Sequence, residues 1–247
     1  MEFFWVSLFR IRLFIRLTFG YELAIFNVDQ SPYHHNETGS QNKATLGVRG
    51  STVPVVEGNS DVKSRWTANL TTSSCFTAVA GGPMPWAECM FKGAYNGKLD
   101  ARLQEYDRSR GFPKWFTVTT SPKGSYRETD IIAFLMKHLE PWREGRDWRI
   151  LLADDYSAHK SENVWQFCWS REYILLIHGG GNTPVAQTPD TDLNEHVRRE
   201  YGNRECAHLM EKMRAGQIVP KLTHEECLAI MLQVLSGPAL HEHASKG

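Results

Sequence analysis

The stretch RILLADDYSAHKSENVWQFCWSREYILLIHG, residues 149–179, decides the fold class of this protein. With the two residues before it, its apolar start predicts a β-strand at 147–154. The polar and apolar residues that follow have helical spacing from Lys160, and the apolar run from Tyr173 predicts a second strand. A strand, a helix and a strand in this order are typical of a βαβ unit, in which the two strands run parallel. We therefore expect an α/β protein.

The residues before this unit predict an antiparallel part of the same sheet. ELAIFNV at 22–28 has the composition of a strand, and a polar loop is expected after it. Two runs rich in Val, Thr and Trp, at 44–57 and 62–72, are separated by a turn and predict two further strands. The weakly periodic stretch 73–111 is predicted to be an insertion that holds one short helix.

The rest of the chain completes the predicted fold. A strand is expected at 115–120, then an amphipathic helix that Pro141 ends, and further helices towards the C-terminus. Three antiparallel strands followed by βα units favour an α/β fold with a mixed β-sheet and helices on both faces. We expect an apolar and basic segment at 1–20, one core domain at 21–202 and a helical extension at 203–247.

The overall charge of the chain favours no charged partner. Lys and Arg number 28 and Asp and Glu number 28, so a nucleic acid would have to be bound by a local basic patch. Lys43, Arg49, Lys63 and Arg65 lie near Trp66 on the predicted hairpin. They could follow a DNA backbone, or they could form an ordinary solvated face of the sheet.

The N-terminal segment MEFFWVSLFRIRLFIRLTFG is apolar but is not a good membrane span. Arg10, Arg12 and Arg16 interrupt it before the roughly 18 consecutive apolar residues that a membrane-spanning helix needs. We expect a packed or interfacial amphipathic helix and no stable membrane insertion. A membrane-peripheral function, in which this segment anchors the protein, stays open.

Acidic residues follow the predicted strands at positions where ligands commonly bind. Asp29 and Asp154 come at the ends of apolar runs, and Asp190, Asp192 and Glu195 come at the start of a predicted helix. Three carboxylates that converge on one edge of the sheet would form an oxygen-rich site for Mg²⁺ or Mn²⁺. The sequence therefore predicts a metal-dependent site.

Three motifs around these acids carry a family resemblance. NVDQSP at 27–32 is an apolar strand that ends in Asp, followed by a polar and a small residue. In LLADDYSAH at 151–159 leucines lead to Asp and then to a His. GGGNTPVAQTPDTDLNEHVRREY at 179–201 has a glycine-rich turn, a threonine, a Gln-to-Asp segment and a helix with basic residues. In these motifs the chain resembles the catalytic domain of DDE-superfamily transposases, in the pogo/Tigger branch of the Tc1/mariner group.

The resemblance implies a catalytic and metal-binding triad of Asp29, Asp154 and Asp190, in which Gln187 and Pro189 flank the last acid. Asp154 and Asp190 lie 36 residues apart, which is close to the interval of the family. It further implies an RNase H-like sheet, two Mg²⁺ or Mn²⁺ ions and a DNA endonuclease and strand-transfer activity of the kind used in DNA transposition. DNA is the implied partner, a homodimer is left open, and the nucleus is the implied location.

Several choices stay open from the sequence. Asp192 with Glu195 also fits a helix capping box, so Asp192 is an alternative to Asp190 as the third acid. Neighbours on a strand point to opposite faces, so Asp154 and Asp155 are not both expected to face the metals. The motif favours Asp154. His159 could orient a carboxylate, contact a phosphate or simply be exposed. The alternative function is a catalytically inactive, transposase-derived domain that binds DNA or protein.

Overall fold

The protein is described from a computed structural model, which covers residues 2–20, 23–34, 65–73, 86–140, 148–178, 194–218 and 220–237. The strands are β1 (Ala24–His34), β2 (Arg65–Ser73), β3 (Trp86–Lys92), β4 (Phe116–Ser121), β5 (Arg149–Ala153) and β6 (Tyr173–Ile177). The helices are α1 (Glu2–Phe19), α2 (Lys98–Arg110), α3 (Glu128–His138), α4 (Glu162–Ser170), α6 (Asn194–Arg214) and α7 (His224–Leu235).

The strands form one mixed sheet in the order β4-β3-β2-β1-β5-β6. The pairs β1–β2 and β2–β3 are antiparallel, whereas β5 is parallel to β1 and β6 is parallel to β5. The βαβ unit expected from the sequence is β5–α4–β6. Three antiparallel strands followed by parallel strands that a helix connects are the expected RNase H-like arrangement, which is thereby confirmed. β4 adds a further strand, parallel to β3, at the other edge.

The third antiparallel strand comes from an unexpected part of the sequence. It is β3, which lies inside the stretch 73–111 that was expected to be an insertion, whereas the strand expected at 44–57 lies outside the described residues. Residues 87–91 of β3 are all buried, because the sheet is covered on both faces at this point. The alternation of polar and apolar residues that reveals a half-buried strand is therefore missing from β3. The short helix expected in the same stretch is α2.

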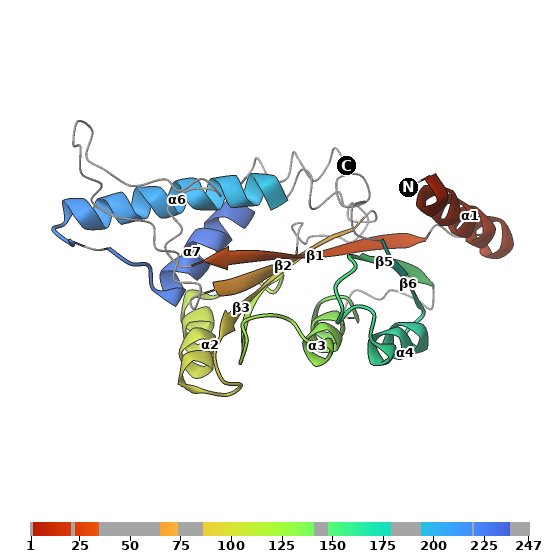
Figure 1. Cartoon of the computed structure of the whole chain (residues 1–247), viewed down its shortest axis with the longest axis horizontal. Coiled ribbons are helices and arrows are strands. Elements are labelled where there is room, and N and C mark those ends of the chain that lie inside the picture. Colours follow the sequence, from red (N-terminus) through yellow and green to blue (C-terminus); the bar gives the residue numbers. More distant parts are fainter. Residues whose placement is uncertain are drawn as a thin grey trace.

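Helices cover both faces of the sheet, as Figure 1 shows, with α3 and α4 on one face and α6 and α7 on the other. Phe26 of β1 belongs to an apolar cluster with Phe134 of α3 and Val164 of α4. Tyr33 of β1 belongs to a second cluster with Tyr201 of α6, and the two rings pack edge to face at 5.2 Å. Since side chains alternate along a strand, the odd-numbered residues of β1 lie on the face that α6 covers.

The C-terminal helices are part of the core. α6 runs without a break from Asn194 to Arg214, so it crosses the boundary that was expected between residues 202 and 203. In α7, Cys227, Leu228 and Met231 are fully buried against the sheet and α6. Of the residues after 202, those described in α6 and α7 therefore pack into the same core as the sheet.

Helix α1 packs on the face of the sheet opposite α3 and α4, over β5 and the start of β1. Leu8 and Ile15 of α1 are buried in a cluster with Leu23, Ile150 and Leu152, which agrees with a packed helix. Other large apolar side chains of α1 are exposed, namely Val6, Phe9, Leu13, Phe14, Leu17 and Phe19. Among the described residues, no helix is both long and apolar enough to cross a membrane.

Candidate active site

Asp29 lies in the middle of β1 and not at the end of a strand as expected. β1 continues to His34, and residues 30–34 pair with β2 where a polar loop was expected. Asp29 nevertheless lies just past the point where the parallel pairing of β1 with β5 ends, because β5 stops at Ala153. Asn27 pairs with Leu152, so Asp29 and Asp154 each lie two residues beyond that pair. The register therefore brings the two predicted acids to the same edge.

Asp29 is buried, with 4% of the residue's surface exposed. Asn194, the first residue of α6, donates a hydrogen bond from Nδ2 to Asp29 Oδ2. Burying a carboxylate is costly unless donors compensate it, and this amide supplies one donor. Asn194 thus ties the start of α6, the helix of the third motif, to the first acid.

Asp154 directly follows β5, and its side chain is 38% exposed. His159 Nδ1 lies 2.7 Å from Asp154 Oδ1, and the main-chain N–H of Tyr156 donates to the same oxygen at 3.3 Å. Partial burial alone would raise the pKa of Asp154. The hydrogen bond and charge of His159, the Tyr156 N–H and the charge of His178 outweigh it and lower that pKa below its ordinary value. The carboxylate is therefore held ionised, which suits a ligand of a cation.

The structure also separates Asp154 from its neighbour. Asp155 turns to solvent and pairs with Lys160 at 2.9 Å, and both side chains are 47% exposed. His159, in contrast, is buried, so the expectation that it is simply exposed does not hold. Of the roles left open for His159, its geometry matches the orientation of a carboxylate.

The third acid lies outside the described residues. Asp190, its alternative Asp192 and the flanking Gln187 and Pro189 all fall in the range 179–193. Within the described part of the chain, no group of three or more His, Cys, Asp or Glu residues could hold a metal ion. The described donor set is thus two carboxylates, Asp29 and Asp154, whose hard oxygens are of the kind that Mg²⁺ and Mn²⁺ prefer.

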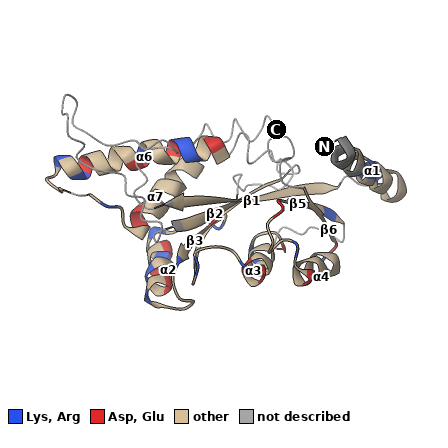
Figure 2. Cartoon of the chain, viewed as in Figure 1, with Lys and Arg blue, Asp and Glu red and all other residues tan. Residues whose placement is uncertain are grey.

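Sequence reasoning missed several residues that surround these acids. Asn194 is one, because an Asn has no distinctive spacing until its partner is known. Arg198, one turn further along α6, donates from Nη2 to Ser31 Oγ of β1 at 3.1 Å. Figure 2 shows Lys and Arg intermixed with Asp and Glu along α6. Arg198 therefore places a positive charge beside Ser31, which lies two residues after Asp29 on β1.

The predicted basic hairpin is only partly described. Trp66 is completely buried and stacks between Tyr33, at 4.7 Å between ring centroids, and Phe91, at 5.1 Å. It therefore belongs to the core, and its ring is not available to stack on a nucleic-acid base. Lys43, Arg49 and Lys63 lie outside the described residues.

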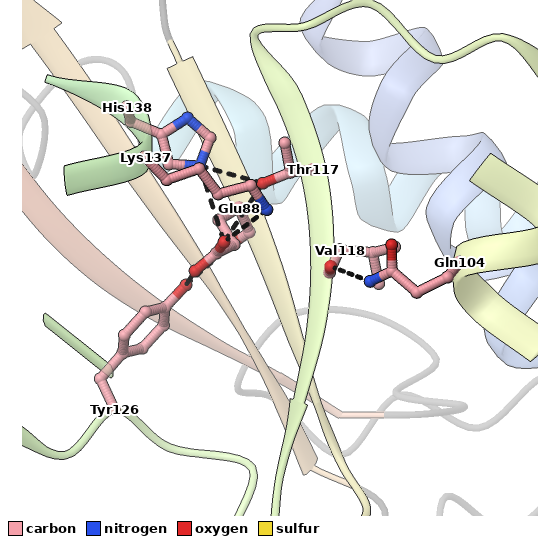
Figure 3. Close-up of polar contacts among 7 residues, drawn as sticks. All are labelled: Glu88, Gln104, Thr117, Val118, Tyr126, Lys137 and His138. Carbon is pink, nitrogen blue, oxygen red and sulfur yellow. Dashed lines mark hydrogen bonds and ion pairs between the residues drawn. The ribbon is translucent and has the colours of Figure 1, made fainter. Parts of the chain in front are cut away.

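A second acid–histidine cluster, which was not predicted, lies between β3 and α3. Glu88 of β3 is only 6% exposed, and Figure 3 shows the side chains that surround its carboxylate. Tyr126 donates to Oε1 at 3.0 Å, Thr117 donates to Oε2 at 3.2 Å, and Lys137 Nζ lies 3.4 Å from Oε2. His138 Nε2 lies 3.6 Å from the same oxygen. These contacts occupy both oxygens of the Glu88 carboxylate, so the cluster is suited to stabilising the fold.

Comparisons with known proteins return distant likenesses in structure. No family model matches the sequence, and no curated protein matches it. A Mos1 transposase paired-end complex with the left transposon end has a TM-score of 0.41 and 11% identity, over 96% of this chain and 58% of that chain. The Mos1 strand transfer complex has a TM-score of 0.41 and 10% identity, over 90% and 54%.

A Mos1 mariner paired-end complex with Mn has a TM-score of 0.39 and 10% identity, over 90% of this chain and 55% of that chain. The chain therefore spans a little over half the length of these solved chains. Likenesses of this size add no argument about activity, and the description of the fold depends on the order and direction of the strands.

Proposed function

We propose that this chain is a transposase-derived, DDE-type domain of the pogo/Tigger kind that cuts and joins DNA phosphodiesters with divalent metal ions in the nucleus. One observation carries the proposal. Asp29 and Asp154 are far apart in the sequence. Each lies two residues after the last residue pair, Asn27 and Leu152, in which β1 and β5 run parallel. This is where an RNase H-like sheet would present two carboxylates to a metal ion.

The reach of the covalent chain allows a third acid at this edge. Asn194 contacts Asp29 directly, and consecutive residues of an extended chain advance by roughly 3.3–3.6 Å. The Cα atom of Asp192 is thus restricted to about 7 Å from that of Asn194, and the Cα atom of Asp190 to about 14 Å. Both residues can reach the neighbourhood of Asp29, so both remain candidates to complete the triad.

Bound Mg²⁺ or Mn²⁺ would supply charge stabilisation for the attacking and leaving oxygens of the phosphodiester. The described residues supply what surrounds that charge. Asp29 and Asp154 would be ligands, Asn194 holds the first carboxylate and His159 holds the second. Arg198 lies on the same helix as Asn194 and carries the positive charge that a DNA phosphate contact requires.

The test is nicking of supercoiled DNA by the purified full chain while Mg²⁺ or Mn²⁺ is titrated. Asp29→Asn and Asp154→Asn are each expected to reduce nicking by at least about 100-fold, because a metal ligand is lost. Asp155→Asn is the matched control, since it removes an adjacent carboxylate that pairs with Lys160, and it should nick normally. Comparison of Asp190→Asn with Asp192→Asn identifies the third acid.

A catalytically inactive descendant that binds DNA or protein is the second candidate, and the burial of Asp29 beneath Asn194 favours it. Nicking that is absent from the wild type at every metal concentration, with DNA still bound in a gel-shift assay, would support this alternative. Normal nicking by Asp154→Asn would contradict the proposed role of that residue.

A further inference from the structure

His159 contacts both β1, the strand that carries Asp29, and Asp154, the residue that follows β5. Its ring is buried, with 3% of the residue exposed. Nδ1 faces two oxygens of Asp154, the carboxylate Oδ1 at 2.7 Å and the main-chain carbonyl at 3.2 Å. Nε2 faces the side-chain amide nitrogen of Gln30 at 3.4 Å. One imidazole ring therefore connects the residue after Asp29 to Asp154.

The chemistry of these partners assigns the proton of the ring. Both oxygens of Asp154 are acceptors, so Nδ1 must carry the hydrogen that is shared between them. The Gln30 amide nitrogen can only donate, so Nε2 must be the acceptor. In the neutral form of the ring, the proton therefore lies on Nδ1 and points towards Asp154.

Gln30 is well placed to hold this arrangement because it stands on a rigid element. It lies in the middle of β1 and pairs with Asn69 of β2. Gln30, Asn69 and His159 line one small cavity of about 10 Å³ whose other lining side chains are apolar. Apart from Asn69, the side chains around this contact are apolar, so the ring has few alternative polar partners.

We propose that Gln30 and His159 are positioning residues for Asp154: Gln30 fixes the His159 ring with its proton on Nδ1, and the ring fixes the Asp154 carboxylate. This inference rests on the proposed function, in which Asp154 is a metal ligand. Outer hydrogen bonds of this kind orient ligands, and their loss typically lowers metal affinity by roughly 10- to 100-fold.

The first test reads the ring directly and needs neither metal nor DNA. Long-range ¹H–¹⁵N NMR of the metal-free full chain distinguishes the two neutral forms of each of the 10 histidines, and His159→Leu identifies the signal. The proposal requires a fixed Nδ1–H form that Gln30→Leu converts into a mixture. A proton on Nε2 in the wild type, or a Gln30→Leu spectrum identical to it, would overturn the assignment.

The second test measures Mn²⁺ affinity of the full chain by electron paramagnetic resonance. His159→Leu and Gln30→Leu should weaken binding, by about 10- to 100-fold for the first. His159→Asn, whose amide can replace the Nδ1–H donor, should recover most of the affinity. Gln104→Leu is the matched control, because it removes a partly buried Gln hydrogen bond to Val118 on a distant strand (Figure 3), and it should leave affinity unchanged.

The outcomes separate this inference from the proposed function. Unchanged Mn²⁺ affinity in His159→Leu, together with weak binding by Asp154→Asn, would overturn the positioning role and leave the metal site intact. The expected NMR and affinity changes in a protein that never nicks DNA would support the positioning role while the proposed activity fails.

Discussion

Two pairs of an acid and a histidine in this protein have similar chemistry and different surroundings. Glu88 lies within β3 and contacts His138 at the end of α3, and the acid is 6% exposed. Asp154 and His159 lie at the end of β5, and the acid is 38% exposed. In both pairs the histidine ring is almost completely buried. The difference is the position of the acid along its strand.

This difference determines what each carboxylate can do. Tyr126, Thr117 and Lys137 occupy the oxygens of Glu88, so the pair is closed to ligands. Both contacts described for the Asp154 side chain use the same oxygen, Oδ1, and the residue reaches solvent. An acid within a strand can stabilise the fold, whereas an acid at the end of a strand can also bind a ligand.

The largest effect on stability is expected from Glu88→Leu. It leaves the buried side chains of Tyr126 and His138 without their carboxylate partner, and loss of one member of a buried polar cluster costs about 3 kcal/mol or more of the free energy of unfolding. Urea unfolding of the full chain measures this loss. Adding His138→Leu should recover part of it, and a double variant less stable than Glu88→Leu alone would contradict a coupled pair.

The same cluster should make stability depend on acid pH. Burial alone would raise the pKa of Glu88, but the hydrogen bond from His138, the charges of Lys137 and His138 and the hydrogen bond from Tyr126 lower it below its ordinary value. A lowered pKa means that the ionised acid stabilises the folded state. This contribution is present above about pH 4.5 and is lost as the pH falls through the lower, folded-state pKa.

The measurement is the difference in unfolding free energy between the wild type and Glu88→Gln over a range of pH. We expect it to be constant at neutral pH and to shrink as the medium is acidified below pH 4.5, the ordinary pKa of the side chain. A difference that grows on acidification would reverse the sign that we assign to Glu88.

Asp154→Asn should have a much smaller effect on stability. The side chain is partly exposed, and an Asn oxygen can still accept the hydrogen bond from His159. The free energy of unfolding should change by less than about 1 kcal/mol, although metal-dependent nicking is lost. A destabilisation as large as that of Glu88→Leu would show that Asp154 is also a structural residue.

The smallest effect is expected at a third, partly exposed group of charges between α6 and α7. Glu226 contacts Lys212 at 2.7 Å and His208 at 3.0 Å, and it accepts from Thr223 at the start of α7. Gln at this position keeps the capping bond, so Glu226→Gln removes the charge alone. We expect a loss of less than about 1 kcal/mol that disappears in high salt. A loss that high salt does not reduce would contradict a charge interaction that solvent screens.

Patterns of apolar residues predicted the elements whose residues follow a regular period. The βαβ unit β5–α4–β6 and the helix α3 were found because their apolar residues keep the spacing of a strand or a helix. The end of β1 was predicted wrongly for the opposite reason. Ser31 is polar yet fully buried, and Pro32 is usually a sign of a loop, so the sequence conceals a strand that continues to His34.

The candidate site was only partly predictable. Asp154 could be found because an apolar run ends in front of it. Its preference over Asp155 agrees with their contacts, since Asp155 pairs with Lys160 in solvent. Asn194 and Gln30 could not be found in this way, because an Asn or a Gln has no distinctive spacing until its partner is known. The third acid stays a prediction from the motif.

The sequence by itself determined the fold class and the place where the second acid leaves its strand, because both depend on the local order of apolar and polar residues. Only the tertiary structure decided which groups hold the acids. Asn194 meets Asp29 across 165 residues, and Gln30 meets His159 across 129. Contacts between residues so distant along the chain arise only when the sheet and α6 have packed, and no local pattern encodes them.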